Sequence, residues 1–248
     1  MSISSKARAE RQAKERKRWK KRQEARYSHF PVSRLDDFDD IEDEIVLLGA
    51  LPGGVPGEEI EINHGPMPDP TFETLSKHWR KRLAFVKTTK PEGMVPYLDV
   101  LAEAVEADLP LPLLWNHLGN AYLLSGRIDK AGMIFEETIR RFPEYFYGRP
   151  TYAHWLLRHG RAADALEVMG GDFNLPRLLH GRKVIHFQEA CGFHLLRAEY
   201  YLTVNDLTAA AESMDIMELI SPLHPAINDL RDQMQAALTK KMGWFGRW

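Results

Sequence analysis

The sequence predicts an all-α repeat protein, and three observations lead to this fold class. From Thr71 onward, apolar residues recur at helical spacing, which is typical of amphipathic helices that share a core. Between residues 112 and 222, a pattern of small and large residues recurs after 34 and then a further 45 positions. Repetition on this scale indicates stacked structural units. Residues 49–70 are rich in Pro and Gly, so they cannot continue a helix and separate the repeats from an N-terminal extension.

The first copy of the repeated pattern reads LWNHLGNAY from Leu114, followed by Gly126, Ala131, Phe135 and Pro143. Corresponding positions in the later copies carry similar residues, which are Ala153, Leu156, Gly160, Ala165 and Met169, then Ala198, Tyr201, Asn205, Ala210, Met214 and Pro222. Small residues let paired helices approach closely, and large residues fill the space between them. Gly126 and its equivalents suit a left-handed turn, and the prolines are expected to end the second helices.

This pattern resembles the tetratricopeptide repeat (TPR), a helix–turn–helix unit that stacks into a superhelix. The resemblance extends over residues 112–222 and implies about three repeats in a right-handed, all-α arrangement. The second copy has Arg149 where the first has the large Trp115, and the third has His194 at this position. Eleven extra residues before the third copy fit a loop insertion around residues 170–176.

The flanking segments are expected to complete the stack. Residues 71–89 and 94–107 resemble the two helices of a degenerate leading repeat, with Leu98, Leu101 and Val105 along one face. Beyond the last repeat, four apolar residues recur at the spacing of a terminal capping helix, namely Ile227, Leu230, Met234 and Leu238. We therefore expect a TPR-like domain over residues 71–240 with enough repeats to be stable.

In proteins of this kind, the first helix of each repeat lines a concave groove that takes a peptide or a helix of a partner. The resemblance implies that the groove residues here are Leu113, Asn116, Asn120, Leu123, Tyr147, His154, Leu157, Arg158, Leu195, Glu199 and Leu202. Asn120, His154 and Glu199 hold the same repeat position and are expected to form a polar ladder. Some members of the family clamp a C-terminal carboxylate, but Asn116 stands where they have a lysine. An alternative is that residues 27–70 of this chain fill the groove.

A basic arm is expected over residues 1–28, as a helix or a disordered segment. Residues 6–26 hold eleven Lys and Arg against three Glu, a net charge of +8, so the rest of the chain carries −10. Such an arm can be a solubilising tail, contact this chain's own acids, bind RNA or DNA phosphates, or bind an acidic protein. For the nucleic-acid alternative, the candidate contacts are Arg11, Lys14, Lys17, Arg18, Lys21 and Arg22.

Residues 29–70 are predicted to be an acidic and then Pro/Gly-rich extension. Seven acids between residues 36 and 44 surround Phe38 and Ile41, a composition typical of segments that fold on a partner. The same run contains DDxxD, but the second acidic motif of a diphosphate-binding enzyme is missing, so we interpret the match as chance. Residues 45–48 and 59–62 could pair as a small hairpin.

No motif in the sequence indicates an enzyme. The single cysteine, Cys191, excludes an intramolecular disulfide and a Cys-based zinc site. His186 and His194 are eight residues apart, about two turns along one helical face, which is too far to share an ion without a third ligand. We therefore expect structural histidines, no catalytic residue, no metal and no cofactor.

The sequence accordingly favours a non-enzymatic adaptor or scaffold that binds a protein partner in the groove. The alternative is a nucleic-acid-associated factor anchored by the basic arm. The charged N-terminus lacks the apolar stretch of a signal peptide, and the longest apolar run is far shorter than the ~18 residues of a membrane span. A cytoplasmic protein is therefore expected. The aromatic and basic tail, residues 241–248, is expected to fold over the cap, to dock on a partner or to insert at a membrane interface.

Overall fold

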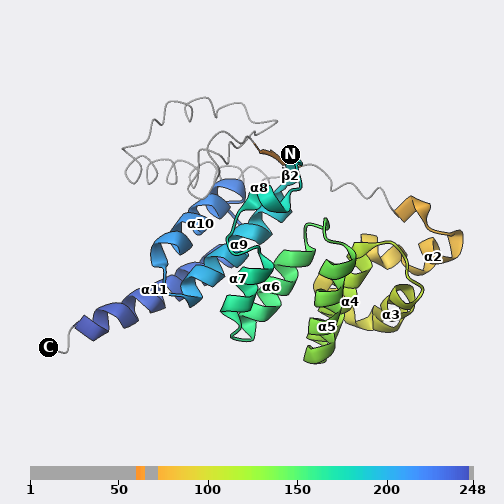
Figure 1. Ribbon diagram of the computed structural model, residues 1–248, viewed down its shortest axis with the longest axis horizontal. Helices are drawn as coiled ribbons and strands as arrows, with labels where there is room; N and C mark the ends of the chain where they lie inside the picture. The colour runs from red at the N-terminus through yellow and green to blue at the C-terminus, as the bar shows by residue number, and fades with distance from the viewer. Residues whose placement is uncertain (1–59, 65–71, 246–248) are drawn as a thin grey trace, which may run out of the picture. The chain divides into compact units, whose positions relative to one another are not determined.

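The computed structural model describes residues 60–64 and 72–245 (Figure 1). These residues are mainly helical, so the predicted all-α class is confirmed. They divide into two compact units. Unit 2 comprises residues 72–173 and 178–180, and unit 1 comprises residues 60–64, 174–177 and 181–245.

Unit 2 begins with short helical segments rather than with the two continuous helices expected at residues 71–89 and 94–107. The segments are η2 (Phe72–Thr74), α2 (Lys77–Arg82), η3 (Ala84–Lys87), η4 (Pro91–Gly93), η5 (Val95–Tyr97) and α3 (Leu98–Glu106). Pro96 explains part of this difference in the second expected helix, because a proline has no N–H for the helical ladder. The expected apolar face of the second helix is present, since Leu98 and Leu101 are buried and Val105 packs against the same core.

Two helix–turn–helix pairs complete unit 2, and their turns have the predicted geometry. The pairs are α4 (Pro112–Leu124) with α5 (Ile128–Arg141), and α6 (Gly148–Arg158) with α7 (Ala162–Val168). Gly126 and Gly160 have φ of 78° and 74°, in the left-handed region that glycine adopts without a steric penalty. Helix α5 ends two residues before Pro143, as expected. Helix α6 also packs against α4 and α5.

The predicted close approach of paired helices occurs between α4 and α5 at Gly119. A Cβ atom at this position would lie 2.3 Å from Cε1 of Phe135. The Phe135 ring is buried and therefore occupies the space that the missing side chain leaves. A second glycine, Gly132, does the same between α5 and α6, where a Cβ would lie 2.6 Å from Cζ2 of Trp155. Close packing of these helices thus depends on glycine paired with a large aromatic ring.

Unit 1 contains a third helix pair and a long terminal helix. Helix α9 (Phe187–Thr203) packs against α10 (Leu207–Ile220), and α11 (Ala226–Phe245) packs against both. Asn205, in the turn, has the left-handed φ of 60°. Asp206 caps α10, because its Oδ1 accepts a hydrogen bond of 3.1 Å from Ala209 N. The prediction of a left-handed turn at Asn205 is confirmed, and α10 ends before Pro222 as expected.

The terminal cap is only partly as predicted. Ile227 and Leu230 are buried in a cluster with Ala198, Met214 and Met217, and Met234 packs against that cluster. Leu238, the last residue of the expected apolar stripe, is 39% exposed instead. The stripe therefore leaves the core within the second half of α11.

The region between the second and third pairs is more structured than the expected loop. It contains α8 (Leu175–Leu178) and β2 (Val184–His186). Strand β2 pairs in parallel with β1 (Glu61–Asn63), with Ile62 opposite Ile185. Both isoleucines are buried. The other half of the expected hairpin, residues 45–48, lies outside the described residues.

His186 lies in strand β2 and does not share a helical face with His194, so that sequence interpretation is wrong. His186 is the N-cap of α9, and its Nδ1 accepts a hydrogen bond of 3.2 Å from Gln188 N. Glu189 returns the interaction by accepting a 3.0 Å bond from His186 N. This reciprocal capping box fixes where α9 begins, and therefore ends the preceding strand at the same residue.

Candidate functional site

Four of the expected groove residues form one half-buried stripe along α4, namely Leu113, Asn116, Asn120 and Leu123. Their spacing of three, four and three residues places them on one side of the helix. Leu114, Trp115 and Leu118, on other sides, are buried. This α4 stripe is therefore the less buried side of a helix whose remaining surface lies largely in the core.

The two asparagines of the α4 stripe differ in their hydrogen bonds. Asn120 Nδ2 donates a hydrogen bond of 3.0 Å to the Asn116 backbone oxygen, which holds the Asn120 amide against its own helix. Asn116 Oδ1 is buried and accepts no hydrogen bond within the described part of the chain. A buried acceptor without a donor costs about 1–3 kcal/mol. A ligand that supplied an N–H to this oxygen would recover that free energy once the half-buried Asn116 side chain turned its Oδ1 toward the surface.

Helix α6 presents a second set of the expected groove residues. Tyr147, the N-cap, and His154 are half-buried, and Arg158 is exposed. Arg158 Nε donates a hydrogen bond of 2.8 Å to His154 Nε2, so the two side chains form one polar pair along the helix. Leu157 is buried, with 8% of its surface exposed. Because α6 packs against α4, the α6 residues and the α4 stripe belong to adjoining helices of unit 2.

The three remaining groove candidates lie on α9, in unit 1. Leu195 and Leu202 pack partly against the buried cluster that α9, α10 and α11 share. Glu199 is half-buried, and its backbone oxygen accepts a 2.8 Å bond from Thr203 Oγ1. Asn120 and His154, the first two members of the expected polar ladder, are therefore in unit 2, whereas Glu199 is in unit 1.

Buried histidines occur in both units, and burial is the main cause of their altered pKa. Burial lowers the pKa of His117 to about 4. Burial, with a smaller contribution from the nearby Arg197 charge, lowers the pKa of His194 to about 3. Both rings are therefore neutral near pH 7. Among the described residues, no group of three or more His, Cys, Asp and Glu side chains is arranged to hold a metal ion.

Arg197 is a buried charge that the sequence pattern did not single out. It lies 3.6 Å from Glu212 and 5.3 Å from the centre of the Tyr201 ring. Its position in the repeat corresponds to Leu118 of the first copy, where a large apolar residue packs. The signal available in the sequence was therefore a charge at a position where the repeat buries an apolar side chain.

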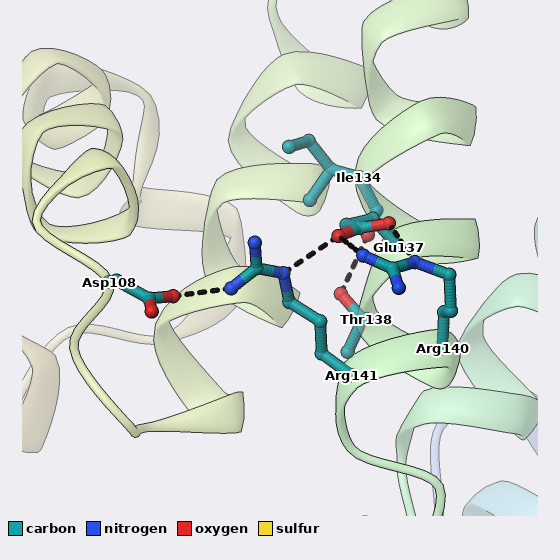
Figure 2. Close-up of polar contacts among 6 residues, drawn as sticks. All are labelled: Asp108, Ile134, Glu137, Thr138, Arg140 and Arg141. Atoms are coloured by element: carbon teal, nitrogen blue, oxygen red, sulfur yellow. Dashed lines mark hydrogen bonds and ion pairs between the residues drawn. The ribbon is translucent and has the colours of Figure 1, made fainter.

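A network of ion pairs on the surface links the end of α5 to the turn before α4 (Figure 2). Glu137 accepts hydrogen bonds of 2.7 Å from Arg140 Nε and from Arg141 Nε. Arg141 also pairs with Asp108, and its guanidinium lies 4.8 Å from the centre of the Trp115 ring. The hydrogen bonds from Arg140 and then Arg141 lower the pKa of Glu137 to about 2. All these charges are paired within unit 2, so we interpret the network as structural.

Comparison with known proteins returned no match to a family model, to a curated protein or to a solved structure. The candidate nucleic-acid contacts, from Arg11 to Arg22, lie outside the described residues, as do residues 246–248 of the aromatic tail. Within the described ranges, no helix combines the length and the apolar character needed to cross a membrane.

Proposed function

We propose that this chain is a protein-interaction scaffold of the TPR type, and that α4 and α6 form part of the surface that binds a partner peptide. The observation that carries the proposal is the unpaired, buried Asn116 Oδ1 on the α4 stripe. Three further features support the repeat assignment, namely the helix pairs, the left-handed turns at Gly126 and Gly160, and the packing of α6 against α4.

The partner that this surface fits best is an extended peptide or one side of a helix with small apolar side chains. Leu113 and Leu123 offer apolar contacts at the two ends of the α4 stripe. Asn116 Oδ1 would accept a hydrogen bond from a peptide N–H, which is how main-chain atoms contribute to affinity in such complexes. Arg158 adds a positive charge beside His154, so a partner with an acid at the neighbouring position is favoured.

The test is a selection from a peptide library displayed on phage, with the full-length chain as the bait. Peptides that bind are then measured against Asn116→Leu, which removes the acceptor and keeps a similar volume. We expect a loss of affinity of about tenfold, equivalent to about 1.4 kcal/mol. The same substitution removes a buried unpaired acceptor, so it is not expected to destabilise the fold.

The control is Met133→Ala on α5, because Met133 is 69% exposed and belongs to the other helix of the pair. Peptide binding should be unchanged in this variant. Asn120→Ala and His154→Ala should each weaken binding while the helical circular dichroism spectrum is retained. Equal binding by all three site variants and the wild type would refute the assignment of the surface. Failure of the full chain to enrich any peptide would refute the proposed function itself.

A further inference from the structure

Helix α2 carries a group of cations with no acidic partner in the described part of the chain. Lys77, Arg80 and Lys81 are exposed, and none of them forms an ion pair with a described residue. Arg80 and Lys81 lie three and four residues after Lys77, so all three are on the same side of the helix. We refer to these three residues as the α2 cation face.

The other large residues of α2 show that this face points away from the core. Trp79 packs against the buried cluster of unit 2. Arg82 forms an ion pair of 2.6 Å with Glu103 and lies 5.1 Å from the centre of the Trp79 ring. The charge of Arg82 is therefore paired within unit 2, whereas the three cations of the α2 cation face form no ion pair with a described residue.

Charge is segregated along unit 2. Residues 72–97 contain six Lys and Arg against two Glu, a net charge of +4. Residues 98–173 contain seven Lys and Arg against eleven Asp and Glu, a net charge of −4. Lys87, whose Nζ lies 5.0 Å from the centre of the Phe72 ring just ahead of α2, belongs to the positive segment. A polyanion would therefore approach unit 2 at α2 rather than at its repeats.

We propose that the α2 cation face binds the phosphodiester backbone of a nucleic acid, and this inference does not rest on the proposed peptide site. Three exposed cations on a folded helix match a series of phosphates, which exchange their condensed counterions for Lys and Arg. A long polyanion can also contact the basic residues 6–26 of the same chain. Two basic segments on one polypeptide increase affinity together, because binding by one raises the local concentration of the other.

The composition of α2 argues against a membrane as the partner. A helix that lies in a membrane interface places large apolar residues beside its cations. The outward positions of α2 are Lys77, His78, Arg80 and Lys81, all of them exposed. The aromatic residue of this helix, Trp79, packs against the protein core, so most of its ring is not available for insertion into lipid.

The test measures how binding of the full-length chain to a single-stranded RNA of about 20 nucleotides depends on salt. The site variant is Lys77→Gln/Arg80→Gln/Lys81→Gln. The matched control is Arg127→Gln/Lys130→Gln/Lys183→Gln, which changes the net charge equally at exposed residues elsewhere. Each lost phosphate contact reduces the slope of log K against log salt by about 0.7, so the site variant should lose about 2 in slope. That difference corresponds to a factor of about 20 over a fourfold change in salt concentration.

A second measurement on the wild-type chain does not depend on how the variant folds. Acetylation of lysines, read by mass spectrometry, should be slowed at Lys77 and Lys81 by the RNA and unchanged at Lys130 and Lys183. Equal slopes for the site variant and the control would overturn the proposal, and so would unprotected Lys77 and Lys81. Binding to phosphatidylserine vesicles with the same dependence on the α2 cation face would assign the surface to membranes instead. Because the peptide selection uses different residues, failure of this test leaves the scaffold proposal standing.

Discussion

The close packing at Gly119 yields the most direct prediction, because the structure gives both the gain and the cost of adding one methyl group. Gly119→Ala should gain about 1 kcal/mol in helix propensity within α4. The new Cβ would lie 2.3 Å from Phe135 Cε1, whereas carbon atoms in contact prefer a separation of about 3.5–4.0 Å. Either the ring or the helix must therefore move by more than about 1 Å in a buried environment.

Overpacking of this kind costs about 1–3 kcal/mol, and the size of the overlap places Gly119→Ala near the upper limit. The expected net effect is a destabilisation of about 2 kcal/mol, measured by urea unfolding followed by circular dichroism. Phe135→Leu alone should also destabilise, because it shortens a buried side chain. In the double variant, however, the smaller side chain makes room for the methyl group, so the two costs should be less than additive by about 1–2 kcal/mol.

Gly192 is the matched control, since it lies inside α9, is exposed, and an added Cβ would meet no atom within 4 Å apart from the nearby backbone of its own helix. Gly192→Ala should therefore stabilise the chain by about 0.5–1 kcal/mol. If Gly119→Ala is as stable as the wild type, or if Phe135→Leu leaves its cost unchanged, the proposed contact between the two helices does not limit their approach.

Three further predictions concern acidic groups, buried histidine and the added strand. Glu137 has a folded-state pKa of about 2 against an ordinary value of 4.5, so its stabilising contribution is complete above pH 4.5 and is lost as the pH falls through 2. Glu137→Gln should therefore have a lower free energy of unfolding than the wild type above pH 4.5, and this difference should shrink as the pH falls from 4.5 to 2. Burial lowers the pKa of His194 to about 3 in the folded chain, so below pH 6.5 this histidine takes up a proton only in the unfolded chain, which disfavours folding. The free energy of unfolding of His194→Met should therefore fall less between pH 6.5 and pH 3 than that of the wild type. Ile62→Ala should destabilise unit 1 by about 2–4 kcal/mol, seen as faster amide exchange in α9, with α4 as the internal comparison.

The parts of the fold that were predictable from the sequence depend on local chemistry. The turns at Gly126, Gly160 and Asn205 require a left-handed φ that few residues tolerate, so their residue types reveal them. The contact of Gly119 with Phe135 follows from the alternation of small and large residues in the repeat. Each of these features depends on residues within one turn or one helix pair, and each of these predictions is confirmed.

The parts that were missed depend on distant partners. Strand β2 has only three residues and pairs with a segment more than a hundred positions earlier, so no periodicity in the intervening sequence indicates it. The segment 71–89 has the apolar spacing of one helix, but within it the structure has the three short segments η2, α2 and η3. At the candidate site, the sequence predicted which residues share one side of α4. That Asn116 Oδ1 is buried without a donor depends on packing around it, which spacing does not encode.

The position of β1 in the chain has a consequence for how unit 1 is held together. Ile60 and Ile62 are each only 3% exposed, and His64 stacks on Phe187 with ring centres 5.2 Å apart. These residues precede unit 2 in the sequence, yet they complete a core whose other members follow it. The core of unit 1 is therefore complete only when residues 60–64 and residues 181–245 are both present. A fragment that begins at residue 72 keeps helices α2 to α11 but leaves Ile185 and Phe187 uncovered, so we expect unit 1 to be less stable in this fragment than in the full-length chain.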